Sequence, residues 1–542
     1  MSRAEILRET LNANLPLIVF LGFYFIATVL GNFFYHTSWA QAWVQSSVFD
    51  TTDFFELSTM RTPGYWILLL MPFAIVPPLA IFSARAAKAL FSKVTFRVPE
   101  FRRLDYVVIT GVAYAYCYYR FRRSHVSEIL SSGVADAWSS VAVRFEILEV
   151  LGFWPLMVMK SILIFLAVYS LIRAMRSREW FWIGAFLINL ILLSEMLVSL
   201  NMKWPVLVYY VALIICVFLF SQRHPYRNTA VAGVGLAVTY LVISVVVQRY
   251  AETSILQKAP IRADPQHRAY QLDRFSGTKS RSTHNEAATR RREIDSSEYT
   301  AEVARKSASL APVLFANALN RMALPYPFYY QVFTEKGQIC GTLVDRILRK
   351  TNPCHPSNLI YEKMYGEETF GGRATAPAAV HITGYALGGW SGALIATVLT
   401  SLVIGLFMGL WQSARTSTLA AAVFVMGGYS AYFFSQLPFE GPLIYDHGVL
   451  WWAVLLVGYT GYRFFLAPTL STAVLAPIGK WVAPALAMPG VQKAIDRTEA
   501  LRDWVVAGLA SATKQLTAGT AGRFVMRMLG KSPPSSKTSL ES

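Results

Sequence analysis

Ten stretches of the chain are apolar and close to 20 residues long, and they constrain the fold more than any other feature of the sequence. The hydrocarbon core of a bilayer is about 30 Å thick, so a helix needs about 20 mostly apolar residues to cross it. Such a segment crosses as a helix because lipid cannot satisfy exposed backbone N–H and C=O groups. We therefore expect an all-α polytopic membrane protein with about ten transmembrane helices. The ten stretches are residues 15–34, 64–82, 105–119, 150–172, 180–200, 204–220, 230–248, 388–411, 418–434 and 449–466.

The composition agrees with a membrane protein. Hydrophobic residues make up 54% of the 542 residues and charged residues only 15%, whereas about 25% of an average soluble chain is charged. The formal net charge of +18 would suggest a nucleic-acid partner in a soluble protein. Basic residues beside membrane spans are instead explained by anionic lipid headgroups. We expect membrane lipid as a partner, no nucleic acid, and neither a metal nor another cofactor.

Basic residues in the short connections predict the orientation of the spans. Lysine and arginine accumulate on the cytoplasmic side, and here they gather before the first span and after every second one. Both termini are therefore expected in the cytoplasm. The residues concerned are Arg3, Arg8, Arg85, Lys88, Lys93, Arg97, Arg102, Arg103, Arg173, Arg176, Arg178, Arg223, Arg227 and Arg415, with others after Arg463.

Residues 105–119 are the weakest of the ten stretches, because they are few and rich in tyrosine. The alternative is a helix that lies in the membrane interface. Without this span every later connection would change sides, and the arginine-rich turns would lie outside. The distribution of basic residues therefore favours ten spans.

The spans divide the chain into four regions. Residues 1–248 hold seven spans, and residues 388–470 hold three. Between them, residues 249–387 form one large late loop on the outer, periplasmic side. Its part 279–306 is polar and is expected to be flexible, whereas its second half is aromatic and is expected to form helices on the membrane surface. Residues 471–542 are expected to form an amphipathic cytoplasmic helix and a disordered tail.

Four cysteines divide between spans and loop. Cys117 and Cys216 lie in predicted spans and are expected to act as small packing residues. Cys340 and Cys354 both fall in the large loop, which would be oxidising in a bacterial periplasm. A disulfide between these two is therefore a candidate.

Basic residues on the predicted outer side are candidates for binding a phosphate group. Lys203 lies at a tight turn between two spans, where it can simply extend to the lipid headgroups. The bias against lysine on the outer side nevertheless calls for an explanation, and a lipid-linked phosphate would supply one. Arg249, Arg321 and Arg373 border the large loop, and the arginine fork matches the oxygens of a pyrophosphate.

A histidine and several tyrosines surround the point where the chain re-enters the membrane. His381 can act as a general base near neutral pH, although a single histidine is more often an ordinary interfacial residue. Tyr326, Tyr329 and Tyr330 in the loop form an aromatic surface suited to stacking on sugar rings, and Tyr385 is grouped with them as a glycan-binding candidate.

Two charged residues lie inside predicted spans. Lys160 falls near the middle of the fourth span and Glu195 in the outer third of the fifth. An isolated charge in the membrane is costly, so we expect the two to form an ion pair inside the bundle. Proton movement is the alternative.

The order of these parts resembles the bacterial O-antigen and exopolysaccharide repeat-unit polymerases and the related O-antigen ligases. Shared parts are about ten spans, a basic residue and a proline at an outer mid-chain turn, one large late loop, and a re-entry with histidine, an aromatic residue and spaced glycines. In this chain the corresponding residues are Lys203, Pro205, His381, Tyr385, Gly388, Gly389 and Gly392.

The resemblance implies a metal-independent glycosyltransferase of the bacterial inner membrane. A growing glycan on undecaprenyl pyrophosphate would move onto a sugar hydroxyl of an incoming lipid-linked repeat unit, with a chain-length regulator as a further partner. The four basic residues above would stabilise the leaving pyrophosphate. His381 would be the base or would orient the acceptor, with Glu367 and Glu368 as an alternative pair of bases.

Three other functions stay open. An O-antigen ligase has the same order of parts. A membrane glycosyltransferase that uses lipid-phosphate sugars would place acidic residues in its first outer loop, as Asp50 and Asp53 do here, but its large loop would come early. A polysaccharide flippase or other transporter is disfavoured by the long outer loop and by the lack of an internal repeat.

Overall fold

The computed structural model of this protein describes residues 3–35, 60–93, 99–132, 137–221, 224–257, 322–341, 355–365, 375–444 and 448–466. These residues form helices and connections, with no strand among them, and each of the ten apolar stretches lies largely in helix. The expected all-α fold is confirmed for the described part of the chain. With π-helical turns marked η, the elements are α1 (Arg3–Tyr24), η1 (Phe25–Val29), α2 (Leu30–Tyr35), α5 (Pro63–Lys93), α6 (Arg103–Arg123), α7 (Val126–Ser132), α8 (Ala137–Leu151), α9 (Phe153–Met157), η3 (Val158–Leu163), α10 (Ile164–Ser177), α11 (Trp180–Ser199), α12 (Lys203–Phe220), α13 (Pro225–Gln257), α17 (Pro325–Glu335), α19 (Pro356–Tyr365), α20 (Val380–Ser413), α21 (Thr418–Phe434), α22 (Glu440–Leu443), α23 (Val449–Gly461) and η5 (Tyr462–Leu466).

Six described helical segments are long and apolar enough to cross a membrane. Two further apolar helices, Trp204–Phe220 and Thr418–Phe434, are shorter. By the length and composition of its helices, the chain is a multi-pass membrane protein. The six segments are Glu9–Phe34, Pro63–Ser92, Phe153–Ser177, Trp180–Ser199, Pro225–Val247 and Val380–Ser413.

The chain divides into two compact units, Met1–Val457 and Gly458–Ser542. The described residues of the second unit are the end of α23 and η5. The expected cytoplasmic helix and tail, residues 471–542, lie outside the described residues, as does the polar loop segment 279–306.

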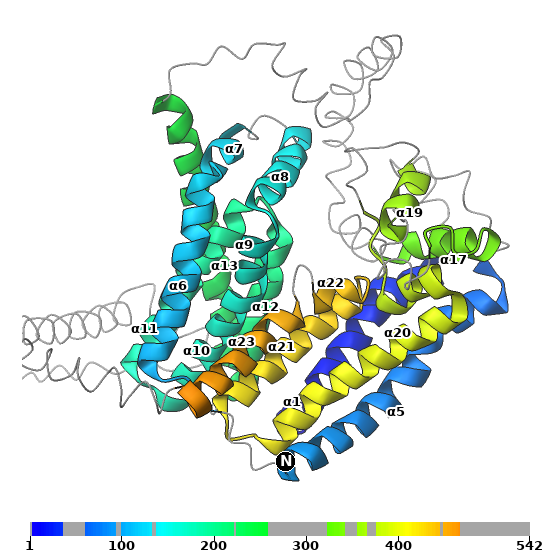
Figure 1. Ribbon diagram of the computed structural model, residues 1–542, viewed down its shortest axis with the longest axis horizontal. Helices are drawn as coiled ribbons and strands as arrows, with labels where there is room; N and C mark the ends of the chain where they lie inside the picture. Colours follow the sequence, from blue (N-terminus) through cyan, green and yellow to red (C-terminus); the bar gives the residue numbers. More distant parts are fainter. Residues whose placement is uncertain are drawn as a thin grey trace, which may run out of the picture. The chain divides into compact units, whose positions relative to one another are not determined.

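Helices α5 and α20 run side by side along most of their length (Figure 1). Small residues allow this close approach. A Cβ atom added to Gly409 would lie 2.6 Å from the carbonyl oxygen of Ala84. A Cβ atom added to Gly405 would overlap the carbonyl oxygen of Ala80. Ser83 Oγ donates a hydrogen bond to the Leu402 carbonyl at 2.9 Å. Glycine and alanine at such contacts are typical of helix packing in membranes.

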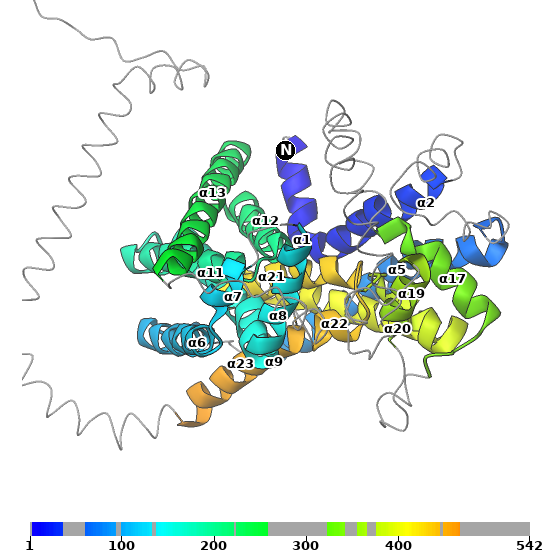
Figure 2. The same ribbon diagram turned by 90° about the horizontal axis from the view of Figure 1, so that it is seen from above.

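A second group of helices surrounds α10. Ten residues of α10 are buried, and the helix packs against α11, α12 and α21, while α11, α12 and α13 contact one another (Figure 2). The preceding π-helical turn, η3, holds Lys160, whose side chain is buried. Glu195 accepts a hydrogen bond from Tyr118 Oη at 2.5 Å. The expected ion pair between Lys160 and Glu195 is not formed among the described residues, because Glu195 faces α6 instead.

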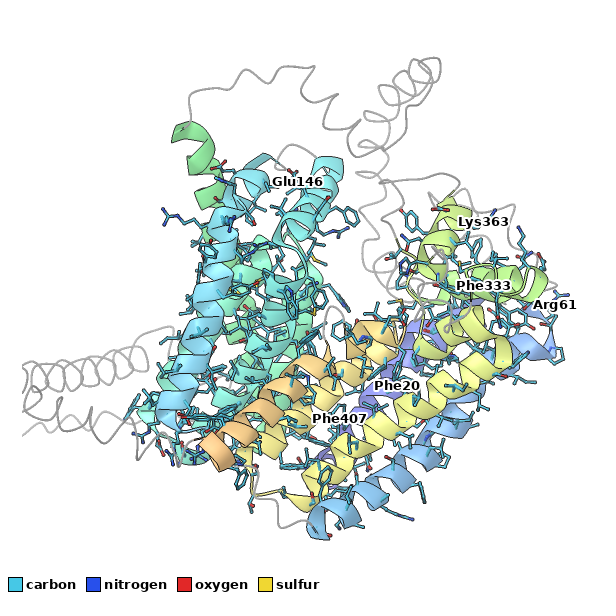
Figure 3. The ribbon with its side chains drawn as sticks, viewed as in Figure 1. Phe20, Arg61, Glu146, Phe333, Lys363 and Phe407 are labelled. Carbon is cyan, nitrogen blue, oxygen red and sulfur yellow. The ribbon has the colours of Figure 1, made fainter. Side chains whose placement is uncertain are left out.

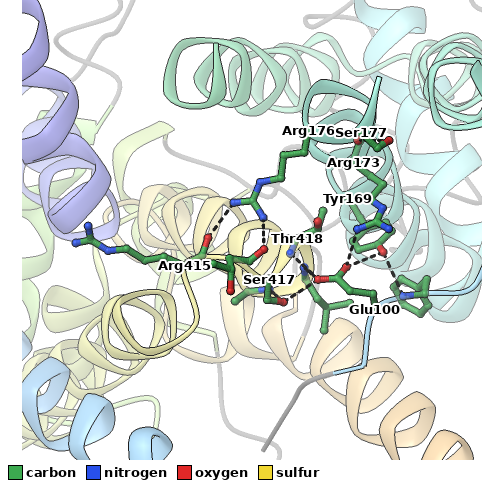
Figure 4. Close-up of polar contacts among 12 residues, drawn as sticks. Glu100, Tyr169, Arg173, Arg176, Ser177, Arg415, Ser417 and Thr418 are labelled. Atoms are coloured by element: carbon green, nitrogen blue, oxygen red, sulfur yellow. Dashed lines mark hydrogen bonds and ion pairs between the residues drawn. The ribbon is translucent and has the colours of Figure 1, made fainter. Parts of the chain in front are cut away.

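Glu100 joins three segments at one end of the bundle (Figure 4). Its Oε1 accepts hydrogen bonds from Ser417 Oγ at 3.0 Å and from the Thr418 backbone N–H at 2.6 Å. Its Oε2 accepts from Tyr169 Oη at 2.9 Å, and Arg173 lies 4.0 Å away. A carboxylate at the first turn of α21 satisfies N–H groups that have no intrahelical partner and complements the positive end of the helix dipole. We call this group the Glu100 cluster.

Candidate functional site

The chain reverses direction inside α20, at Gly388 and Gly389. Gly389 has a φ of 59° and a ψ of −147°, a combination that favours glycine. In a continuous helix, Gly384 and Gly392 would be about 12 Å apart at 1.5 Å per residue. A Cβ atom added to Gly384 would instead lie 2.6 Å from the carbonyl oxygen of Gly392. Therefore α20 is a helical hairpin with a short arm, residues 380–387, folded against a long arm, residues 390–413.

Two helices from the large loop, α17 and α19, pack against each other and against α20. Figure 3 shows Phe333 of α17 and Lys363 of α19 at the same end of the molecule as Arg61, just before α5. Thr62 Oγ1 donates a hydrogen bond to Tyr330 Oη at 3.2 Å, and Thr334 Oγ1 lies 2.9 Å from Tyr385 Oη. The second half of the loop thus includes helices that close over the short arm and the start of α5.

His381 lies in the first turn of the short arm and is completely buried. Its Nε2 is 3.0 Å from Tyr24 Oη, and the two rings meet edge to face. Tyr24 Oη also donates a hydrogen bond to the carbonyl of Leu69 in α5 at 2.8 Å. His381 Nδ1 forms no hydrogen bond within the described residues. Sequence reasoning proposed His381 but missed Tyr24, which lies in an apolar span where nothing marks it out.

Pro72 leaves one carbonyl of α5 without its helical donor at the level of His381. Proline has no N–H group, so the carbonyl of Leu68, four residues earlier, lacks its intrahelical donor. The Leu68 carbonyl lies beside the His381 imidazole, yet no hydrogen bond of acceptable geometry reaches Nδ1. A proline inside a span thereby creates an acceptor next to the histidine.

The aromatic surface expected in the loop is part of the hydrophobic core instead. Tyr326 and Tyr329 are 0% exposed, and Tyr330 and Tyr385 are each 6% exposed. Their hydroxyl groups bind protein atoms: Tyr329 Oη, for example, donates to the Ala376 carbonyl at 3.1 Å. Local sequence shows aromatic residues but not which partner covers them. Stacking of these rings on a sugar would require this packing to open.

A second buried polar cluster was not predicted. Asn32 is 0% exposed; its Nδ2 donates to the Thr28 carbonyl at 2.7 Å, and its Oδ1 accepts a hydrogen bond from Tyr65 Oη. Tyr326 Oη donates to the Tyr65 carbonyl at 2.5 Å. An asparagine within a span was the available signal, because an amide there needs partners inside the protein.

No protein-family model, curated protein or solved structure matches this chain. The resemblance to repeat-unit polymerases therefore stays a prediction that rests on the order of parts and on the re-entry residues.

The side chains of the four basic candidates are not among those that the structure describes. Lys203 is the first residue of α12, and Arg249 lies near the end of α13, but their side chains are outside the description. Arg321 and Arg373 lie outside it entirely, as do the alternative bases Glu367 and Glu368. No group of three or more metal-ligating side chains occurs among the residues that the structure describes.

The cysteines follow the expected division as far as the structure describes them. Cys117 and Cys216 are free and buried. Cys340, at the end of the loop segment that carries α17, is buried and disulfide-bonded. Cys354, its expected partner, lies outside the described residues, so the pairing stays a prediction.

Proposed function

We propose that this protein is a membrane glycan polymerase, which joins undecaprenyl-pyrophosphate-linked repeat units on the periplasmic face of the bacterial inner membrane. The main observation in its favour is the position of His381. This histidine lies in a short re-entrant arm, between membrane helices and the folded helices of the large loop. A base at such a boundary can serve a substrate whose lipid stays in the membrane while its glycan extends outside.

The proposed reaction needs a base and positive charge. A sugar hydroxyl of the incoming unit attacks the anomeric carbon of the growing chain, and its proton passes to His381, with Glu367 and Glu368 as the alternative. The bond between the anomeric carbon and the pyrophosphate oxygen breaks, and its electron pair leaves with the pyrophosphate. Lys203, Arg249 and the two loop arginines would stabilise that negative charge.

Contacts between span ends support the topology that this function requires. On the predicted outer side, the rings of Trp204 and Tyr432 lie 5.7 Å apart, at the start of α12 and the end of α21. On the predicted cytoplasmic side, Arg176 donates a hydrogen bond to the carbonyl of Arg415 at 3.1 Å. The Glu100 cluster joins the connection before α6 to α10 and to the start of α21 on that same side. Span ends that are predicted to lie on the same side of the membrane are therefore in contact with each other.

The surface of α6 supports a crossing of the membrane by the weakest span. Its buried face carries Tyr106, Thr110 and Tyr114, whereas Leu104 and Val112 on the other side are 70% and 64% exposed. A helix on the surface of a soluble protein would expose its polar side. Apolar residues on the outer face are those expected of a helix that faces lipid.

We therefore expect His125, after α6, to lie on the opposite side of the membrane from Lys88, at the end of α5. The last turn of α6 carries three arginines. If α6 crosses the membrane, these arginines lie on the outer side, where the positive-inside bias disfavours them. This makes α6 the span to test. His125→Cys should react with a membrane-impermeant maleimide in spheroplasts, and Lys88→Cys only after permeabilisation. Both variants would carry Cys117→Ala and Cys216→Ala. Equal labelling of both sites from outside would show that α6 does not cross.

Deletion of the gene tests the function itself. We expect the surface glycan of the deletion strain to consist of single repeat units, and the wild-type gene to restore long chains, as seen by gel electrophoresis of the glycan. His381→Ala should fail to restore them. Long polymer in the deletion strain would contradict polymerase activity, and long polymer held on its lipid carrier would indicate a ligase.

A further inference from the structure

We propose that Tyr24 is a positioning residue for His381, which holds the imidazole as the Nε2–H tautomer so that Nδ1 is the proton-accepting atom. The role in proton transfer rests on the proposed function. The tautomer itself does not, because it follows from the buried hydrogen bonds alone.

The Tyr24 hydroxyl and the imidazole N–H both find an acceptor in only one tautomer of His381. Tyr24 has a single hydroxyl proton, and its oxygen is 2.8 Å from the Leu69 carbonyl oxygen and 3.0 Å from His381 Nε2. The carbonyl can only accept. If the tyrosine donates to Leu69, then Nε2 must carry the proton that bonds to the tyrosine oxygen. Both hydrogen bonds are then made.

The opposite tautomer leaves the imidazole N–H unsatisfied. With the proton on Nδ1, Tyr24 would donate to Nε2, and the Leu69 carbonyl would keep only its helical donor, the Phe73 N–H. The Nδ1–H group would have no acceptor in hydrogen-bond geometry, because Nδ1 is buried and without a partner among the described residues. Burying a donor without a partner costs more than a typical hydrogen bond contributes. An imidazolium carries the same Nδ1–H group, so the neutral Nε2–H ring fits this site.

A hydroxyl group that reached Nδ1 would find two acceptors, the Nδ1 lone pair and the Leu68 carbonyl, which Pro72 leaves without an intrahelical donor. A hydroxyl brought there can donate its proton to Nδ1. In the proposed reaction this hydroxyl belongs to the acceptor sugar, and the Nε2–H bond to Tyr24 keeps the ring oriented as it becomes charged. The ring is closed off from solvent, so a substrate hydroxyl can reach Nδ1 only if the packing around the ring opens.

The experiment combines ¹⁵N NMR with glycan synthesis. Protein labelled at its eight histidines is placed in lipid nanodiscs, and the His381 signals are assigned by their loss in His381→Asn. Wild-type protein should show a protonated Nε2 and an unprotonated Nδ1 at neutral pH. Tyr24→Phe keeps the ring contact but removes the hydroxyl, so the two tautomers should become mixed and polymer formation should fall by about tenfold or more.

Tyr209→Phe is the matched control, because Tyr209 is also 0% exposed and its hydroxyl has no hydrogen-bond partner among the described residues. It should change neither the His381 signals nor polymer formation. A wild-type Nδ1–H signal, or a His381 tautomer unchanged by Tyr24→Phe, would overturn the proposal. If the tautomer is as stated but His381→Ala still makes polymer, Tyr24 does position the ring, and it is the proposed role of His381 in the reaction that fails.

Discussion

We expect Gly384→Ala to destabilise the α20 hairpin by about 3 kcal/mol, the upper end of the cost of adding a methyl group to a packed core. The new Cβ would lie 2.6 Å from the Gly392 carbonyl oxygen and 2.9 Å from Ala396 Cβ. One of these neighbours is backbone and cannot rotate away. The better helix propensity of alanine offsets only about 1 kcal/mol of this cost.

The measurement is thermal unfolding in detergent, followed by circular dichroism. Gly392→Ala should lower the midpoint in the same way, because its Cβ would overlap the Gly384 carbonyl. Gly388→Ala is the control within the same turn: its φ of −150° is open to alanine, and nothing lies within 4 Å of an added Cβ. If Gly384→Ala had the same unfolding midpoint as Gly388→Ala, the two arms of α20 would not be in contact.

We expect Glu100→Ala to destabilise the protein by about 2 to 3 kcal/mol, since hydrogen bonds to a charged group are worth about 1.5–3 kcal/mol. The substitution removes the acceptor of the Thr418 N–H group, 2.6 Å away, and of Ser417 Oγ and Tyr169 Oη. It also removes negative charge from the first turn of α21. Unfolding in detergent should show a lower midpoint.

Glu179→Ala provides a matched control. Glu179 also precedes a helix, α11, and its Oε2 lies 2.7 Å from an Arg103 nitrogen, but the two side chains are 38% and 63% exposed. Exposed ion pairs contribute about 0–1 kcal/mol, so this variant should melt close to the wild type. Equal losses in both variants would mean that the hydrogen bonds of Glu100 to the start of α21 add nothing.

The positions of the helices could be predicted because hydrophobicity over about 20 residues is a local property. Residues 64–82, 180–200 and 418–434 were all expected as helices and are helices. Their lengths were predicted less well: α5 continues to Lys93, since a helix can extend beyond the lipid while its backbone groups stay paired.

The candidate site was predicted in part. The spaced glycines after His381 were part of the predicted re-entry, and two of them, Gly388 and Gly389, lie at the reversal of α20. The aromatic residues expected to bind glycan are packed in the core, because tyrosine can line a sugar site or fill a core and local sequence does not distinguish the two. Their role in glycan binding stays a prediction. Tyr24 and His381 are 357 residues apart in the chain, and no local pattern joins them.

The amino-acid sequence is enough to predict apolar helices of membrane-spanning length, because each such helix satisfies its own backbone hydrogen bonds. Which polar groups in and between those helices meet depends on the tertiary structure. Asn32 with Tyr65, Tyr24 with His381, and Glu100 with the start of α21 all join distant segments. Where lipid or core excludes water, a buried polar group must find its partner within the protein, and the folded arrangement of the helices supplies it.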